Sequence, residues 1–331
     1  MMRLVLVELT RAVWRRTVLL LLAAMVVVPL VIGIFAITGH DSPDGRAQAV
    51  AQAERDAQKP ETQALLRDCL DDPEQFIGTD QPGDAQAACE EAVLPQPDWY
   101  AYDVLDLEYE RDTGSGFGVA VVVALIAMLV GTTFVGHDWN TGSMSNQLLF
   151  ESRRTRVWLA KALAVTSLVG VTALLGTTAF WLLLASRFWT TGASIPDGVL
   201  LDGLQQGWRG AAVAAGAALG GYALTMLSRS TVFTLGVLFG VAVAGGILIS
   251  LLVDDRGWVD PTLNATAVIN DGTSYDVELR DCNGAVPSYD GEESCFETRH
   301  RSAAQGATYL ALLVGVGSAA SVLSYRRRDV P

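Results

Sequence analysis

The sequence predicts an all-α polytopic membrane protein with six transmembrane helices, an N-terminal interfacial helix and two disulfide-bonded extracellular loop regions. The first observation is a conflict in composition. Half of the 331 residues are hydrophobic and the mean hydropathy is +0.32, yet the net charge is −13. The second is segregation of charge, because six long stretches contain no Asp, Glu, Lys or Arg. The uncharged stretches exclude a single soluble domain, and the acidic balance excludes a nucleic-acid binder, which needs a basic face.

The uncharged stretches have the length of membrane spans. Each contains 19 to 25 residues, and about 20 apolar residues in a helix cross a hydrocarbon core of about 30 Å. Inside lipid every backbone amide needs an internal partner, which favours helices. One such stretch is also typical of a buried helix in a large soluble protein, but six in so short a chain are not. We expect transmembrane helices at 17–38, 116–136, 162–186, 210–228, 231–253 and 305–325.

The N-terminal stretch 1–16 is predicted to form an amphipathic interfacial (elbow) helix. At 100° per residue, Glu8, Arg11 and Arg15 share one face. The opposite face carries Leu6, Leu9 and Val13. Such a helix lies in the membrane interface, and an extension of the first span is the alternative. The first span is too long for the apolar core of a signal peptide and no convincing A-x-A site follows Phe35-Ala36-Ile37-Thr38 at its end, so we interpret it as retained.

Arginine placement predicts that both termini are cytoplasmic. The inner segments then hold 12 Lys/Arg in 50 residues and the outer segments hold 11 in 151, a density about threefold lower. Only two lysines accompany 21 arginines, a bias typical of GC-rich bacterial genomes, so we expect the bacterial plasma membrane. The inner segments are 1–16, 137–161, 229–230 and 325–331, the last including the cytoplasmic tail 326–331. The outer segments are 39–115, 187–209 and 254–304.

The two long outer loops carry the acidity and all four cysteines. Loop 39–115 has a net charge of −14 and loop 254–304 one of −7. We interpret both as solvated loops, with attraction of a cationic substrate as the alternative. Disulfides persist outside the cytoplasm, and of the three possible pairings Cys69–Cys89 with Cys282–Cys295 closes the shortest rings. A metal site is disfavoured because the sequence has no C-x-x-C and only His300 lies nearby.

Local composition predicts different structures for the two loops. Residues 45–70 are rich in Ala, Gln, Glu and Arg, which favours helix with a break at Pro60. Residues 262–280 are rich in Thr, Val and Asn with a turn signal at Asp271-Gly272, which favours short strands. Asn264-Ala265-Thr266 has the pattern of a glycosylation acceptor, which we interpret as a chance match.

Small residues predict close helix packing in the fourth and fifth spans. Packing within the chain is the favoured interpretation, and a subunit interface or the wall of a pathway is the alternative. The glycines concerned are Gly216, Gly220 and Gly221 in the fourth span and Gly236, Gly240, Gly245 and Gly246 in the fifth. Those of the fourth span follow a run of alanines at Ala211, Ala212, Ala214 and Ala215.

Motifs for catalysis and nucleotide binding are missing from the sequence. It has no G-x-x-x-x-G-K-[ST], no H-E-x-x-H and no G-x-S-x-G, and its three histidines are far apart. We therefore expect no enzymatic activity, no cofactor and no metal in this chain. The spans also lack the ionisable residues that ion-coupled transporters place at membrane depth. If the protein moves a solute, the energy must come from a partner.

The inner loop 137–161 has a distinctive order of residues. Asp138 leads into a turn of small residues, where Asn140 or Thr141 can cap a short helix. That helix has an apolar end at Leu148, Leu149 and Phe150. Basic residues then precede the third span and can anchor at anionic headgroups. They are Arg153, Arg154, Arg156 and Lys161. An ordinary positive-inside loop is the simpler interpretation of these features.

The order of an acidic residue, a Gly-[Ser/Thr] turn, a leucine pair, a small residue, Arg, and then Val and Lys resembles the cytoplasmic loop of ABC-2-type transporter permeases. The usual family form has Glu, Gly-Thr and Pro where this chain has Asp138, Gly142-Ser143 and Ser152. The interfacial helix, the six spans and the large loop after the first span are also similar to bacterial members. The resemblance covers the whole chain in architecture and about 26 residues in motif.

The resemblance implies a transmembrane permease subunit of an ATP-driven transporter, in the direction of export. In the family two permeases, identical or related, associate among membrane lipids, and each rests on a cytoplasmic ATP-binding subunit that holds ATP and Mg. The loop after span two supplies a coupling helix that docks on that subunit. The residues implied for docking are Asp138, Trp139, Thr141, Gly142, Ser143, Leu148, Leu149, Arg153 and Arg154. Those implied for the interfacial helix are Glu8, Arg11 and Arg15.

A membrane-anchored extracellular sensor or scaffold without transport activity is the alternative function. It is suggested by the two outer loops 39–115 and 254–304, which together contain 128 residues. A membrane enzyme is less favoured than either, because these residues assemble no catalytic constellation.

Overall fold

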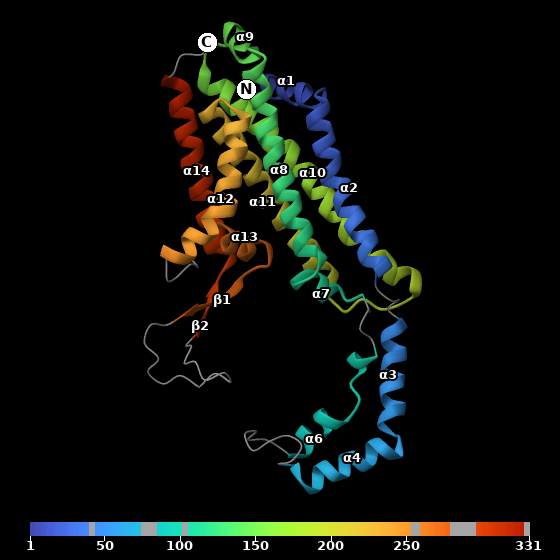
Figure 1. The fold of residues 1–331 in the computed structure, drawn as a ribbon. Helices are drawn as coiled ribbons and strands as arrows, with labels where there is room; N and C mark the ends of the chain where they lie inside the picture. The colour runs from blue at the N-terminus through green and yellow to red at the C-terminus, as the bar shows by residue number, and fades with distance from the viewer. Residues whose placement is uncertain (40–43, 74–84, 101–104, 253–258, 279–295, 328–331) are drawn as a thin grey trace. The chain divides into compact units, whose positions relative to one another are not determined.

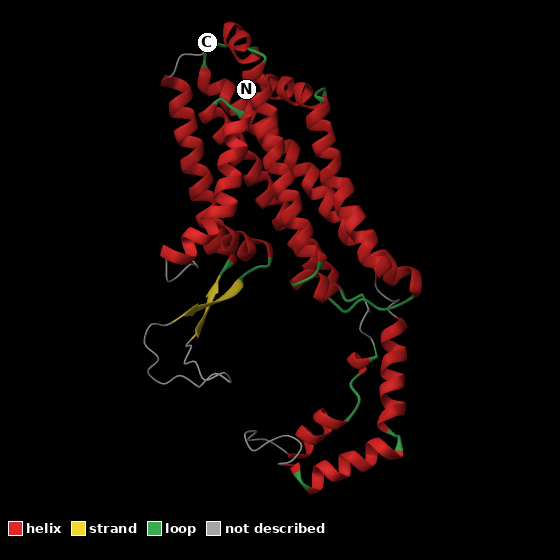
Figure 2. Ribbon diagram, in the orientation of Figure 1, coloured by secondary structure: helices red, strands yellow, loops and turns green. Residues whose placement is uncertain are grey.

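The computed structural model describes residues 1–39, 44–73, 85–100, 105–252, 259–278 and 296–327 (Figure 1). They fall into two compact units. The bundle unit contains Met1–Gly33, Glu108–Leu182 and Gly198–Pro331, and the disulfide unit contains Ile34–Leu107 and Leu183–Asp197. Both units are mainly helical, with strands in the bundle unit only among the described residues (Figure 2).

Five helices of the described residues are long and apolar enough to cross a membrane, which confirms a multi-pass helical membrane protein. They are α2 (Arg16–Gly39), α8 (Ser115–Asn140, preceded by α7, Leu107–Asp112), α10 (Arg154–Thr191), α11 (Val199–Ser228) and α14 (Ala303–Arg327). The fifth predicted span, 231–253, falls on α12 (Thr231–Leu252), whose described side chains end at Val241. That apolar portion is shorter than a crossing, so six spans are not established.

The helices of the bundle extend beyond the uncharged stretches. α10 begins at Arg154, two turns before the uncharged stretch 162–186, and α11 begins at Val199 rather than at 210. Hydrogen bonding of the backbone continues through residues such as Lys161, whose charge ends the apolar run but does not break a helix. Charged side chains therefore belong to the ends of the long helices and not to loops.

The first helix, α1 (Met2–Val13), is separate from α2, with Trp14 and Arg15 between them. Its apolar side chains face outward, since Met2 is 73 % exposed and Leu6 54 %. Glu8, on the opposite face, is buried. α1 and α9 (Ser143–Phe150) lie at one end of the bundle, together with the C-terminal end of α14 (Figure 1).

Close packing in the bundle is concentrated where α8 crosses α11. A Cβ atom on Gly221 would lie 2.6 Å from the carbonyl oxygen of Met128, and one on Gly131 would overlap the carbonyl oxygen of Ala218. By contrast, a Cβ on Gly216 or Gly220 would meet nothing within 4 Å. The small-residue surface of the fourth span therefore packs within the chain on one side only. Open space also surrounds Gly236 and Gly240, and Gly245 and Gly246 lie outside the residues whose surroundings are described.

The opposite end of the bundle unit holds α13 (Pro261–Ile269) and a hairpin of β1 (Thr273–Glu278) and β2 (Phe296–Arg301). The expectation of strands from residue 262 was wrong for α13, because the Asp260 carboxylate caps a helix start that Pro261 favours. The strands pair antiparallel, with Thr273 opposite Arg301. The predicted turn is present between α13 and β1, where Asp271 and Gly272 have positive φ.

The disulfide unit confirms one of the predicted cysteine pairs, Cys69–Cys89. Cys69 lies in α4 (Pro60–Asp71) and Cys89 in α6 (Ala85–Val93), and both are buried with Val93. The unit also contains α3 (Asp44–Ala57) and a short turn of helix, η1 (Pro97–Trp99). The predicted break at Pro60 is the first residue of α4. Cys282 and Cys295 lie outside the described residues.

We expect the double substitution Cys69→Ser/Cys89→Ser to accelerate trypsin cleavage after Arg67 at least fivefold. The cross-link spans 20 residues, and the hydrophobic core beside it is small. Loss of the cross-link raises the conformational entropy of the unfolded segment, so α4 unfolds more often and is exposed to the protease. Limited proteolysis of the purified chain with mass spectrometry of the fragments measures this. The matched control is Cys282→Ser/Cys295→Ser. Equal cleavage rates in the wild type and the Cys69→Ser/Cys89→Ser chain would contradict the prediction.

A polar contact links α3 to η1 in the disulfide unit. The Tyr100 hydroxyl donates to Asp56 at 2.7 Å, and Lys59 Nζ lies 2.8 Å from the same carboxylate. Hydrogen bonds from Lys59 and from Tyr100 lower the pKa of Asp56. Because the lowered pKa favours the ionised folded state, the contribution of Asp56 to stability is present above its unfolded pKa and is lost as the pH falls through the folded pKa, below about pH 4.

Candidate functional site

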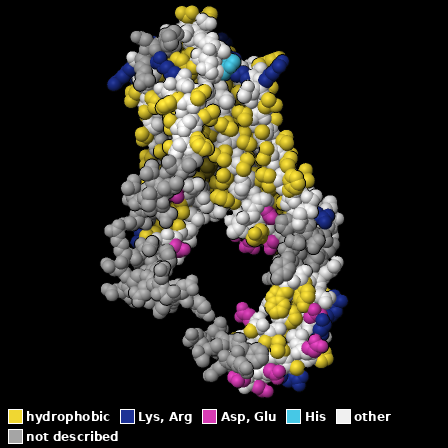
Figure 3. Space-filling model, in the orientation of Figure 1, with side chains coloured by type: hydrophobic (Ala, Val, Ile, Leu, Met, Phe, Trp, Pro, Cys, Tyr) yellow, Lys and Arg dark blue, Asp and Glu magenta, His cyan; other side chains and the backbone are white. Residues whose placement is uncertain are grey.

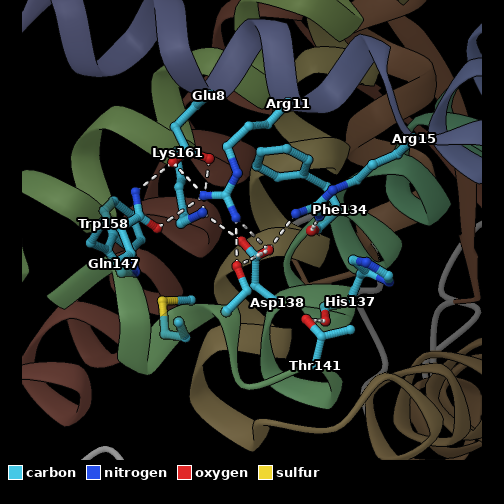
Figure 4. Close-up of polar contacts among 12 residues, drawn as sticks. Glu8, Arg11, Arg15, Phe134, His137, Asp138, Thr141, Gln147, Trp158 and Lys161 are labelled. Atoms are coloured by element: carbon cyan, nitrogen blue, oxygen red, sulfur yellow. Dashed lines mark hydrogen bonds and ion pairs between the residues drawn. The ribbon is translucent and has the colours of Figure 1, made fainter. Parts of the chain in front are cut away.

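A buried cluster of charged residues lies where α1, α8, α9 and α10 meet (Figure 4). Asp138 stands in the last turn of α8, and Lys161 stands two turns into α10. Glu8 comes from the inward face of α1. The three side chains are 0 to 1 % exposed, which is unusual for charged residues and requires that each be paired.

Lys161 lies at the centre of the cluster. Its Nζ atom donates to Glu8 Oε2 at 2.8 Å and to Asp138 Oδ2 at 2.5 Å. The ammonium group also lies 5.6 Å from the centre of the Phe134 ring. One buried cation therefore joins carboxylates of α1 and α8 to α10.

Arg11 of α1 and Arg15, which lies between α1 and α2, close the cluster on the more exposed side. Arg11 contacts Glu8 at 3.2 Å and Asp138 at 3.4 Å, and Arg15 forms an ion pair with Asp138 and donates to the carbonyl oxygen of Phe134. Two carboxylates thus face three cations. Removing ions from water costs several kcal/mol each, and this arrangement offsets the cost by giving both carboxylates several donors.

The short helix α9 is attached to this cluster by its inward face. Gly142 has a φ of 68°, a conformation that glycine adopts without steric cost, and it turns the chain from α8 into α9. Ser143 Oγ lies within hydrogen-bonding distance of Arg11 and Asp138, and Gln147 donates to Glu8 at 2.5 Å. Met144 is buried, with its sulfur 3.3 Å from the Tyr325 hydroxyl of α14.

The outward end of α9 is apolar and exposed. Leu149 is 82 % exposed and Phe150 93 %, whereas Leu148 is half-buried. Exposed Arg153 and Arg156 follow at the start of α10. A short helix with one face hydrogen-bonded to a buried ionic cluster and an apolar end projecting outward can dock on another protein and transmit a displacement to α1, α8 and α10.

The structure divides the predicted site residues into two groups. Glu8, Arg11, Arg15, Asp138 and Ser143 come together in the cluster, while the others lie around it. Trp139 packs edge-on against Tyr325 with ring centres 6.3 Å apart, Thr141 donates to the His137 carbonyl, and Arg154 donates to the Tyr325 carbonyl. Exposed or half-buried positions are taken by Gly142, Leu148, Leu149 and Arg153.

Sequence reasoning missed Lys161 and Gln147 as members of the cluster. Lys161 was assigned only a place at the mouth of the third span. A usable signal existed, because Lys161 is one of two lysines in the chain and is the last residue of the inner loop 137–161. Gln147 carried no such signal, and its role follows from the placement of α9 beside α1.

The described residues contain no group of three or more His, Cys, Asp or Glu side chains that could hold a metal ion. The cluster is rich in donors instead, so its chemistry is that of fixed ion pairs between helices.

Comparison with known proteins leaves the site to be judged on its own geometry. No family model, no curated protein and no solved structure matches this chain. The residues themselves establish a multi-pass helical membrane protein with a buried ionic cluster and a protruding apolar helix at one end of its bundle.

Proposed function

We propose that the chain is the permease subunit of an ATP-driven exporter of the ABC-2 type, acting as a dimer on two ATP-binding subunits. The carrying observation is α9, held by the cluster of Glu8, Asp138 and Lys161 and ending in exposed Leu149 and Phe150. Both termini would then face the cytoplasm of a bacterial cell. Lys and Arg side chains at the α1–α9 end support this orientation (Figure 3).

The exposed pair Leu149-Phe150 suits a protein partner better than water. Two adjacent large apolar side chains at an end of the bundle that also carries Arg153 and Arg156 form a small apolar anchor with a charged rim, which is the anatomy of a docking contact. The inward face of α9 is fixed, so a partner that moves α9 also moves the buried ion pairs.

In the proposed transporter the partner subunit, and not this chain, binds ATP. The sequence contains no P-loop, so ATP and Mg would be held by the separate ATP-binding subunit. Closure of two such subunits around ATP would displace α9, and the cluster would carry that displacement into α1, α8 and α10. Helices joined by discrete ion pairs can switch between two packed arrangements, which is how such a displacement is transmitted.

We expect the double substitution Leu149→Asp/Phe150→Asp to lower recovery of a P-loop ATPase with the purified chain at least tenfold. Two carboxylates replace the apolar anchor, while the exposed positions allow folding. Affinity purification from native membranes, with mass spectrometry and ATP-hydrolysis assays, measures this. The control is Leu65→Asp/Leu70→Asp, a pair on α4 of similar chemistry that is also exposed.

The proposal fails if the wild-type chain brings down no P-loop ATPase, or if the Leu149→Asp/Phe150→Asp chain brings down as much as the wild type. The alternative function, a membrane-anchored extracellular sensor or scaffold, is favoured by the disulfide-linked helices of the disulfide unit. A neighbouring kinase gene together with an absent ATPase would support that alternative.

A further inference from the structure

A groove at the N-terminal end of α14 combines a fixed guanidinium with an apolar wall. We propose that this groove binds an anionic membrane lipid, with the lipid phosphate on Arg301 and an acyl chain along Tyr309 and Leu312. The proposal stands on this end of the bundle alone and does not depend on the proposed transport function. The groove has a volume of about 400 Å³ and is lined by Arg301, Ala304, Gln305, Thr308, Tyr309 and Leu312.

The cationic group of the groove is oriented by a buried side chain. Arg301 Nε donates to Asn264 Oδ1 at 3.0 Å, and Asn264 is fully buried with its Nδ2 atom donating to the Asp260 carbonyl at 2.8 Å. Within the ranges that the structure describes, the two terminal nitrogens of Arg301 have no carboxylate partner. A guanidinium that is held through Nε and has both terminal NH2 groups remaining suits a phosphate, which accepts two parallel hydrogen bonds.

The wall below Arg301 is apolar and open to the surroundings. The Tyr309 hydroxyl donates to the Val259 carbonyl at 2.7 Å, which fixes the ring at the side of the groove. Leu312, one turn further along α14, is 64 % exposed. Of the five long apolar helices among the described residues, α14 has the smallest buried share, so the described part of the chain leaves this wall largely uncovered.

Arg301 and Leu312 are spaced along the chain so that one can contact the headgroup of a lipid and the other its acyl chain. Arg301 precedes the first residue of α14 by two positions, and Leu312 lies about three turns inside the helix. With a rise of 1.5 Å per residue, Leu312 lies about 14 Å along α14 from Ala303, which is within the length of one acyl chain, about half of a hydrocarbon core of about 30 Å. Arginine and tyrosine at such a boundary are typical contacts of headgroups and interface.

The combination favours a lipid over a soluble anion. A free phosphate ion would bind Arg301 but would leave the apolar surface of Tyr309 and Leu312 uncovered. A zwitterionic lipid would cover that surface but would place its own cationic group next to Arg301. An anionic phospholipid satisfies both the unpaired charge and the apolar wall, which is the charge complementarity that selects this occupant.

The full-length protein, purified in detergent and exchanged into mixed vesicles, tests the proposal through the lipids it retains. We expect native mass spectrometry to show phosphatidylglycerol retained at least tenfold over phosphatidylcholine by the wild type. Arg301→Gln should abolish the preference. Leu312→Trp, which fills the groove at an exposed position and leaves the Arg301–Asn264 bond intact, should lower retention at least fivefold.

The matched control is Arg299→Gln, which removes the same charge from the same strand. The Arg299 side chain pairs with Glu297 and does not line the groove. The lipid preference of Arg299→Gln should equal that of the wild type. Equal retention of both lipids by the wild type, an unchanged preference in Arg301→Gln, or an unchanged retention in Leu312→Trp would overturn the proposal. Displacement of the lipid by millimolar inorganic phosphate alone would identify a soluble anion as the ligand and would also overturn it.

Discussion

Replacing Lys161 with methionine is expected to destabilise the bundle unit by about 3–5 kcal/mol, the cost of removing from two buried carboxylates the one cation that is buried with them. Methionine is an unbranched apolar side chain one atom shorter than lysine, and it lacks the ammonium that contacts Glu8 and Asp138. Both carboxylates are almost fully buried, so water cannot replace the lost donor. Thermal unfolding of the purified chain in detergent, monitored by size-exclusion chromatography of the heated sample, measures the loss.

Two further variants separate the charge effect from packing. Lys59→Met removes a lysine that pairs with Asp56 on the surface, and we expect little measurable change because exposed pairs contribute little. The triple substitution Glu8→Gln/Asp138→Asn/Lys161→Met neutralises the central ions together and should recover most of the stability lost in Lys161→Met. A stable Lys161→Met chain, or a triple variant as unstable as the single one, would show that the ion pairs are not what holds these helices together.

The same variants connect the cluster to the proposed function. If α9 transmits the displacement of an ATP-binding subunit, the triple variant should fold and still bring down the ATPase, since Leu149 and Phe150 are unchanged. Its ATP-dependent transport should nevertheless fall, because the ion pairs that join α1 and α8 to α10, and to which α9 is hydrogen-bonded, are gone. Stability, docking and transport are thus three separate readouts of one cluster.

Hydropathy predicted the long helices because burial in lipid depends on local composition. The uncharged stretches located α2, α8, α10, α11 and α14. The amphipathic pattern of residues 1–16, at 100° per residue, located α1. Helix ends were less accessible to prediction. A charged residue ends an apolar run, but a helix continues through it, so Lys161 and Asp138 were assigned to a loop and belong to α10 and α8.

The contacts of the candidate site lay beyond sequence reasoning for a different reason. Glu8 and Lys161 are 153 positions apart, and nothing in their local sequence indicates that they meet. The ring-closure argument succeeded at Cys69–Cys89 because it concerns residues in one loop. At α13 the composition of residues 262–280 suggested strands, but a capping Asp260 followed by Pro261 determined the structure. Specific start signals there outweighed average propensity.

Two neighbouring glycines of α11 provide the second large expected effect. Gly221→Leu should destabilise the bundle by about 3 kcal/mol, the upper part of the range for overpacking. A Cβ at Gly221 lies 2.6 Å from the Met128 carbonyl oxygen, and backbone cannot rotate away as a side chain can. The α8 and α11 helices would have to separate.

Gly220→Leu is the matched control, because it makes the same chemical change one position earlier in the same helix. A Cβ there meets nothing within 4 Å, and leucine has a higher helix propensity than glycine by about 0.8 kcal/mol, so we expect unchanged or slightly higher stability. Unfolding of both variants in detergent measures the difference. If Gly220→Leu proved the more damaging of the two, its face would have to be covered, and the small residues of α11 would then serve contact with a second molecule in addition to the packing of α8 on α11.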